Sequence, residues 1–152
     1  DRLIDNEPHQ KSESREARAV TLKIIRESVL RDLNWLFNTE NLETVHALDK
    51  FENVSNSVLN YGLPSVSGNT PGALRSQSIE QQVRRTILKF EPRILKETLS
   101  VKATLNTNEF SKSAFVLEIT GDLWAQPIPL QLYLHTEIDI ETGNVQVKSE
   151  EM

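Results

Sequence analysis

Apolar residues in the first part of the chain recur with the period of an α-helix. From about Glu16 they fall three or four positions apart, the spacing of one buried stripe on an amphipathic helix. The stripe consists of Leu22, Ile25, Val29, Leu33 and Leu36. We predict that this face is buried, that Trp35 lies on or beside it, and that the helix ends at Asn38 and Thr39.

A second helix is predicted over residues 78–90. Ser78 followed by Gln81 has the pattern of a capping box, which places the helix start at Ser78. Pro92 disfavours helical backbone at Glu91, so the helix should end at about Phe90. The apolar stripe consists of Ile79, Val83, Ile87 and Phe90.

The segment between these helices gives an ambiguous pattern. Residues 44–51 fit a short helix and residues 54–59 fit a short strand. Residues 61–64 and 67–72 are rich in glycine, proline, serine and asparagine, which is typical of turns and loops.

After residue 98 the apolar period changes from that of a helix to two, which predicts half-buried strands. The inward positions are Leu99, Val101, Ala103 and Leu105, then Phe115, Leu117 and Ile119, then Leu130, Leu132, Leu134, Ile138 and Ile140, and finally Val145 and Val147. Turns are predicted at residues 106–108 and 141–144. The order of elements predicts an α+β fold in which N-terminal helices pack on one face of an antiparallel β-meander.

The composition bounds the class of protein. Hydrophobic residues make up 38% of the 152 residues, enough for a core, and the absence of cysteine excludes a disulfide scaffold and a thiol nucleophile. A net charge of −5 argues against a dedicated nucleic-acid binder. The start is charged rather than signal-like, and no apolar run reaches the roughly 20 residues of a membrane span. We therefore expect a soluble, intracellular protein with one domain over residues 15–152.

Residues 1–14 are polar, with Leu3 and Ile4 as their only large apolar pair. We expect them to form an extended arm that becomes ordered only when a partner holds it.

Residues that could carry chemistry are few and scattered. The three histidines, His9, His46 and His135, have no spacing typical of a metal site, and no phosphate-binding glycine pattern is present. Glycoside hydrolysis needs a carboxyl group that holds a proton, but Arg93 lies two residues from the best candidate, Glu91, and favours its charged form. We expect no catalytic residue, no metal and no cofactor.

Glu91-Pro92-Arg93 is the most distinctive tripeptide in the chain. It has two interpretations. In the first, it ends a helix with a local salt bridge worth at most about 1 kcal/mol if exposed. In the second, proline holds the backbone rigid and arginine offers a forked donor to the carboxylate of a partner.

A β-meander also leaves open edges, which are either protected or used for binding. The short final strand, with Val145 and Val147, is a candidate for pairing with a strand of another chain. The alternative is that its short, charge-flanked edge only prevents aggregation.

Four segments, in order along nearly the whole chain, resemble the TssE family of type VI secretion system baseplate subunits. They are Asp1-Arg2-Leu3, residues 28–33 with 36–39, residues 57–64 and residues 90–93, with Gly143 in the expected last hairpin. This family is related to a contractile-phage baseplate wedge protein and is often labelled lysozyme-like.

The resemblance implies a non-enzymatic wedge subunit that joins TssF and TssG, with TssK beneath, in a cytoplasmic baseplate. It also implies strand addition to the first ring of the TssB/TssC sheath, and it makes Glu91, Pro92 and Arg93 an interaction motif. On this hypothesis Leu3 and Ile4 dock on a neighbouring subunit. The alternatives are a peptidoglycan-cleaving glycosidase and the equivalent wedge protein of a phage tail or another contractile injection machine.

Overall fold

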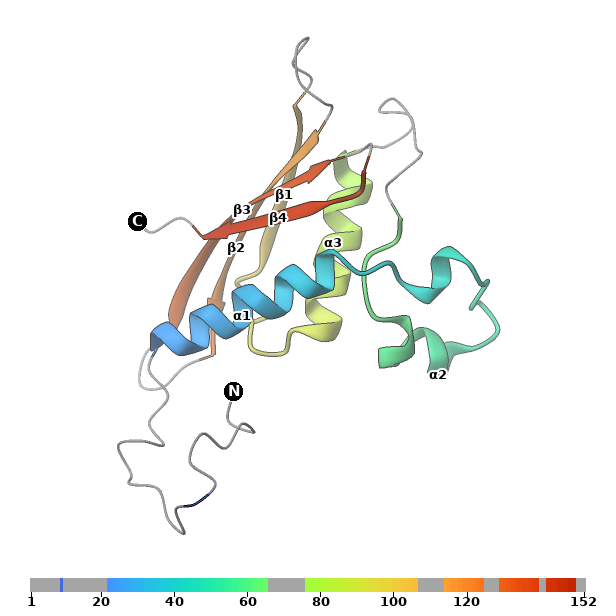
Figure 1. The fold of residues 1–152 in the computed structure, drawn as a ribbon, viewed down its shortest axis with the longest axis horizontal. Helices are drawn as coiled ribbons and strands as arrows, with labels where there is room; N and C mark the ends of the chain where they lie inside the picture. The colour runs from blue at the N-terminus through green and yellow to red at the C-terminus, as the bar shows by residue number, and fades with distance from the viewer. Residues whose placement is uncertain are drawn as a thin grey trace.

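A computed structural model describes residues 22–65, 76–106, 114–124, 129–139 and 142–149, together with His9 (Figure 1). Its helices are α1 (Leu22–Phe37), α2 (Glu52–Ser55) and α3 (Ser76–Phe90), with two single 3₁₀ turns, η1 (Leu42–Thr44) and η2 (Val58–Asn60). Its strands are β1 (Ser100–Asn106), β2 (Ala114–Leu123), β3 (Leu130–Asp139) and β4 (Val145–Ser149).

The four strands form one antiparallel sheet in the order β1-β2-β3-β4. Val101 lies opposite Ile119, and Ile119 lies opposite Leu134, so apolar side chains form rows across one face. Helices α1 and α3 lie against this sheet (Figure 1). The predicted α+β fold with N-terminal helices on an antiparallel meander is therefore confirmed.

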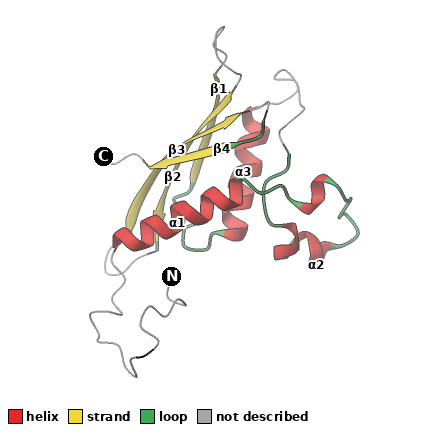
Figure 2. Ribbon diagram, in the orientation of Figure 1, coloured by secondary structure: helices red, strands yellow, loops and turns green. Residues whose placement is uncertain are grey.

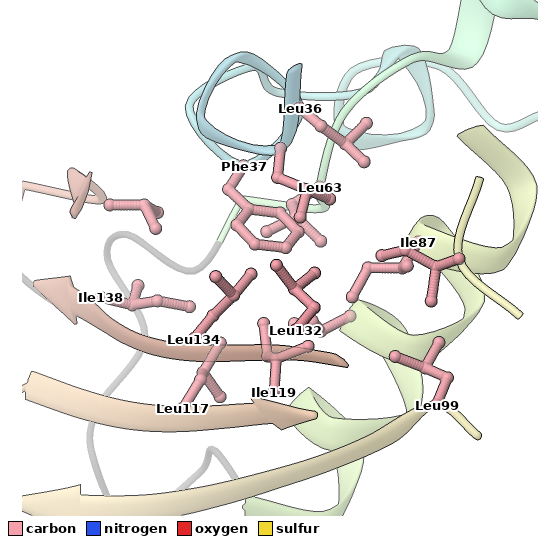
Figure 3. Close-up of a cluster of buried hydrophobic side chains, with 14 of the residues drawn as sticks. Leu36, Phe37, Leu63, Ile87, Leu99, Leu117, Ile119, Leu132, Leu134 and Ile138 are labelled. Atoms are coloured by element: carbon pink, nitrogen blue, oxygen red, sulfur yellow. The ribbon is translucent and has the colours of Figure 1, made fainter. Parts of the chain in front are cut away.

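A single cluster of buried side chains joins the two helices to the inner face of the sheet (Figure 3). Leu33 of α1, Ile87 of α3 and Leu117 of β2 are fully buried in it. The alternating pattern of the predicted strands is seen directly in β2 and β3, where every second residue is buried. Phe37 joins the core at the end of α1, outside the predicted stripe.

Two predictions about α1 were wrong. Leu22 is 47% exposed, because it lies in the first turn of the helix, ahead of the part that meets the core. Trp35 is 58% exposed, because it lies on the opposite side of Leu36 from the buried Phe37 and so faces away from the core. The predicted start at Glu16 lies outside the described residues.

The local predictions for residues 44–51 and 54–59 were also wrong. Residues 45–51 form turns without a helix, and α2 and η2 take the place of the predicted strand. This segment stands to one side of the sheet (Figure 2). Local bonds satisfy its backbone: the Ser57 amide donates to the Val54 carbonyl at 3.0 Å, and the Asn60 side chain donates to the Ser55 carbonyl at 3.1 Å. No described strand lies beside this segment to extend the sheet.

Helix α3 ends at Phe90, as predicted, but it already includes Ser76. Ser78 therefore lies within the first turn rather than at the N-cap, and the predicted capping box was wrong. The predicted turn between β3 and β4 is present, with Gly143 at φ 72° and its amide donating to the Asp139 carbonyl at 2.8 Å.

Thr136 of β3 is a polar residue in the core, fully buried, and its hydroxyl has no hydrogen-bond partner among the residues that the structure describes. Valine has the same shape without the hydroxyl. We expect Thr136→Val to raise the free energy of unfolding by about 1 kcal/mol, because an unsatisfied buried polar group costs roughly 1–3 kcal/mol. Urea denaturation measures this change, with Thr104→Val on the exposed face of β1 as the control. A loss of stability in Thr136→Val would show that the hydroxyl is bonded in solution.

Candidate functional site

The Glu91-Pro92-Arg93 tripeptide forms the turn that follows α3. The Glu91 amide still donates to the Ile87 carbonyl at 2.8 Å, so the last helical hydrogen bond falls on Glu91. Proline next in sequence stops the helix there. The Ile94 amide then donates to the Glu91 carbonyl at 3.3 Å and closes a tight turn.

Glu91 and Arg93 bind each other in this turn. Glu91 Oε1 accepts from Arg93 Nε at 2.6 Å and from the Arg93 amide at 3.2 Å, and Glu91 Oε2 accepts from Arg93 Nη2. The Glu91 side chain is only 3% exposed, whereas that of Arg93 is 34% exposed. The pair is therefore a forked, charge-assisted contact with a buried anion.

Asp32 of α1 completes an ion cluster around Arg93. Arg93 Nη2 donates to Asp32 Oδ2 at 2.5 Å, and Arg31 donates to Asp32 Oδ1 from Nε at 3.0 Å and from Nη2 at 2.8 Å. We call Arg31, Asp32, Glu91 and Arg93 the Arg93 cluster. Its two cations and two anions fasten α1 to the turn after α3, across 61 positions of sequence.

The charges of the Arg93 cluster stabilise one another. The pKa of Arg93 lies above its usual value, mainly because the Arg93 side chain donates hydrogen bonds to Glu91. Burial raises the pKa of Asp32, but hydrogen bonds and charge from Arg31 and Arg93 outweigh it, so the pKa lies below its usual value. Asp32 and Arg93 are thus both ionised at neutral pH.

Aromatic residues surround the Arg93 cluster. The Tyr61 hydroxyl donates to the Asp32 carbonyl at 3.4 Å, and its ring meets Phe90 edge-on at 5.2 Å. Burial, with Asp32 and Glu91 nearby, raises the pKa of Tyr61. Arg31 lies over the Trp35 ring at 5.0 Å, and the Trp124 amide donates to the Arg93 carbonyl at 2.7 Å.

Both tryptophans are more than half exposed. Trp35 is therefore an exposed aromatic residue in contact with Arg31 of the Arg93 cluster, and the backbone of the exposed Trp124 adjoins Arg93. Sequence reasoning missed Asp32, Arg31 and Tyr61 as neighbours of the motif, because no spacing relates them to residues 91–93.

The edge of the sheet at β1 is covered by side chains of α3. Glu80 Oε1 accepts from the Ala103 amide at 2.8 Å. Arg84 donates from Nε to the Leu99 carbonyl and from Nη2 to the Lys96 carbonyl, both at 3.4 Å. Glu80 thus occupies one backbone group of β1, and Arg84 occupies two carbonyls just ahead of the strand, which hinders pairing with another strand at these positions.

The opposite edge is β4, which contains the predicted partner residues Val145 and Val147. Val145 is buried, and both its backbone N–H and its C=O bond to the side chain of Asn38. Val147 is partly buried. The other predicted partner residues, Leu3 and Ile4, lie outside the described residues, so their role stays a prediction.

Within the described ranges, no group of three or more histidine, aspartate or glutamate side chains is placed to hold a metal ion. Among the same residues, no helix is long and apolar enough to cross a membrane.

An α+β domain in which a partly exposed ion cluster fastens α1 to the turn after α3 is suited to protein–protein contact. The comparison with family models supplies its class: the model described as baseplate wedge protein gp25 matches residues 24–128. The match covers more than half of the chain and includes all four residues of the Arg93 cluster. The chain belongs to the baseplate wedge protein gp25 family, and a structural role in a baseplate follows. No curated protein and no solved structure gives a significant match.

Proposed function

We propose that this chain is a non-enzymatic structural subunit of a type VI secretion system baseplate wedge. It joins TssF and TssG, with TssK beneath, and nucleates the first ring of the TssB/TssC sheath. It acts in the cytoplasm, in a baseplate docked on the inner face of the cytoplasmic membrane. Membership of the wedge family, together with the Arg93 cluster on the surface, is the observation that carries this proposal.

Arg93 makes the contact within the wedge. Glu91 is buried and fully occupied, so its part is to orient Arg93 rather than to face a partner. Arginine and tryptophan are the residues that most often dominate binding energy at interfaces. Trp35 and Trp124 beside Arg93 therefore give the partner two apolar anchors around one oriented cation.

The edge of β4 receives a strand of the sheath. At the β1 edge Glu80 holds the Ala103 amide, and Arg84 holds two carbonyls just ahead of the strand. At the β4 edge Asn38 holds Val145, whereas the outward backbone groups of Val147 have no partner among the described residues. Leu3 and Ile4 of the N-terminal arm dock on a neighbouring subunit and become ordered there.

The alternative is a lysozyme-like glycosidase. Its general acid must hold a proton beside a sugar-sized cleft, but the Glu91 carboxylate accepts three hydrogen bonds from Arg93 and is buried. This geometry favours the adaptor. A wedge protein of a phage tail or another contractile machine differs from the first proposal only in its partners.

Co-expression with TssF and TssG, with purification through a tag on TssG, tests the wedge contact. Trp35→Ala is the main variant, because Trp35 is exposed and its removal leaves the core intact. We expect it to reduce co-purification about tenfold, the equivalent of roughly 1.4 kcal/mol of binding. Phe51→Ala is the matched control, since Phe51 is also an aromatic residue and 59% exposed.

The outcomes separate the proposals. Equal recovery of Trp35→Ala and wild type would remove this surface from the wedge contact. Failure of the wild type to associate would contradict the assignment to this baseplate, and peptidoglycan cleavage by the wild type would support the glycosidase. Circular dichroism verifies that each variant is folded.

A further inference from the structure

The first residue of β4 is already paired on its outer side, by a side chain rather than by a strand. Asn38 Nδ2 donates to the Val145 carbonyl and Asn38 Oδ1 accepts from the Val145 amide, both at 2.9 Å. An asparagine side chain is an amide with one donor group and one acceptor, like a peptide group. Asn38 therefore makes the two hydrogen bonds that a residue of a neighbouring strand would make.

The end of α1 holds Asn38 in this position. Asn38 Nδ2 also donates to the Asn34 carbonyl at 2.8 Å, and the Asn38 amide donates to the same carbonyl at 3.2 Å. Both protons of the side-chain amide are thus used, one on α1 and one on β4. Helix α1 runs beside β4 (Figure 1), so the amide is anchored between two fixed elements.

The backbone groups of β4 alternate between its two sides. In an antiparallel pair, every second residue directs its N–H and C=O to the same neighbour. The backbone N–H and C=O of Val145 point outward to Asn38, so the next residues whose backbone groups point outward are Val147 and Ser149. No described residue bonds to the outward backbone groups of Val147.

We propose that Asn38 is the end stop for strand addition at β4. A strand of the contractile sheath pairs with Val147 and Ser149 and ends against the side-chain amide of Asn38. This fixed end sets the register of the sheath strand. A slip of one residue exchanges the two faces of a strand, so a fixed end is useful at an edge this short. This inference rests on the proposed addition of a sheath strand.

Hydrogen exchange of the complex with the TssB/TssC sheath heterodimer, resolved to single residues by mass spectrometry, tests the end stop. In the wild type we expect the Val145 amide to be slow with and without the sheath, and the Val147 amide to become slow only with it. In Asn38→Ala, the sheath strand extends over Val145. At least one further amide of the sheath strand, two residues along, then becomes protected.

Asn34→Ala is the matched control, because it removes a neighbouring amide from α1 and keeps the bonds between Asn38 and Val145. Asn38→Asp serves if the alanine variant does not fold, since it keeps the acceptor and loses the donor. Equal lengths of the protected sheath segment in wild type and Asn38→Ala would overturn the end stop. If Val147 is never protected although the proteins associate, the proposed strand addition itself fails.

Discussion

Arg93→Ala is expected to lower the free energy of unfolding by about 3 kcal/mol, the usual cost of removing one partner of a buried ion pair. The loss arises because Glu91 is 3% exposed and would lose the guanidinium that binds both of its oxygens, which leaves a buried carboxyl group without its partner. Asp32 would lose one of its two arginines as well. Urea denaturation at neutral pH measures the change.

The double variant Glu91→Gln/Arg93→Ala isolates the cause. It replaces the unpaired, buried carboxyl group of Glu91 by a neutral amide. The double variant should therefore be more stable than Arg93→Ala by at least about 1 kcal/mol, a coupling typical of residues in contact. Arg85→Ala is the control, because Arg85 is an exposed arginine on α3. If Arg93→Ala and Arg85→Ala had equally small effects, the Arg93 cluster would contribute nothing to stability.

Gly62→Ala is expected to lower the free energy of unfolding by about 4 kcal/mol, which is a large loss for a single substitution. Gly62 has φ 120°, a conformation that residues with a side chain rarely adopt. A Cβ atom there would lie 2.2 Å from the Thr39 carbonyl oxygen. The backbone must therefore move apart.

That movement breaks the junction between α1 and the segment after η2. The Leu63 amide donates to the Thr39 carbonyl at 2.8 Å, and the Asn41 amide donates to the Leu63 carbonyl at 3.0 Å. Thermal and urea denaturation measure the effect. Gly143→Asn is the control, because asparagine tolerates the left-handed conformation at φ 72°. A similar, small loss in both variants would show that the junction relaxes around the Cβ atom.

The elements predicted well are those that bury one face and expose the other along their whole length. In β2 and β3 every second residue is buried, and in α3 the residues Ile79, Val83 and Ile87 are all buried. Periodicity records such a boundary directly. Residues 54–59 have no such boundary, since their backbone bonds locally and Val58 and Leu59 are exposed. An apolar run there carries no information about pairing.

The candidate site was predicted only in its local part. Pro92 next to Glu91 marks the end of α3, and Arg93 two residues away marks the ion pair, because these effects act over a few residues. Neither the burial of Glu91 nor the contact between Arg93 and Asp32 has a sign in the sequence. Both follow from how α1 packs beside the turn after α3.

By itself, the sequence determined the α+β class, the order of α1, α3 and the four strands, the end of α3 and the ion pair within the Glu91-Pro92-Arg93 tripeptide. Hydrophobic period and proline act on neighbouring residues and need no knowledge of the rest of the chain. The tertiary structure alone decided that Glu91 is buried, that Trp35 is exposed beside Arg93, and that Asn38 occupies the edge of β4 at Val145. These contacts join residues up to 107 positions apart, and only packing of the helices on the sheet brings them together.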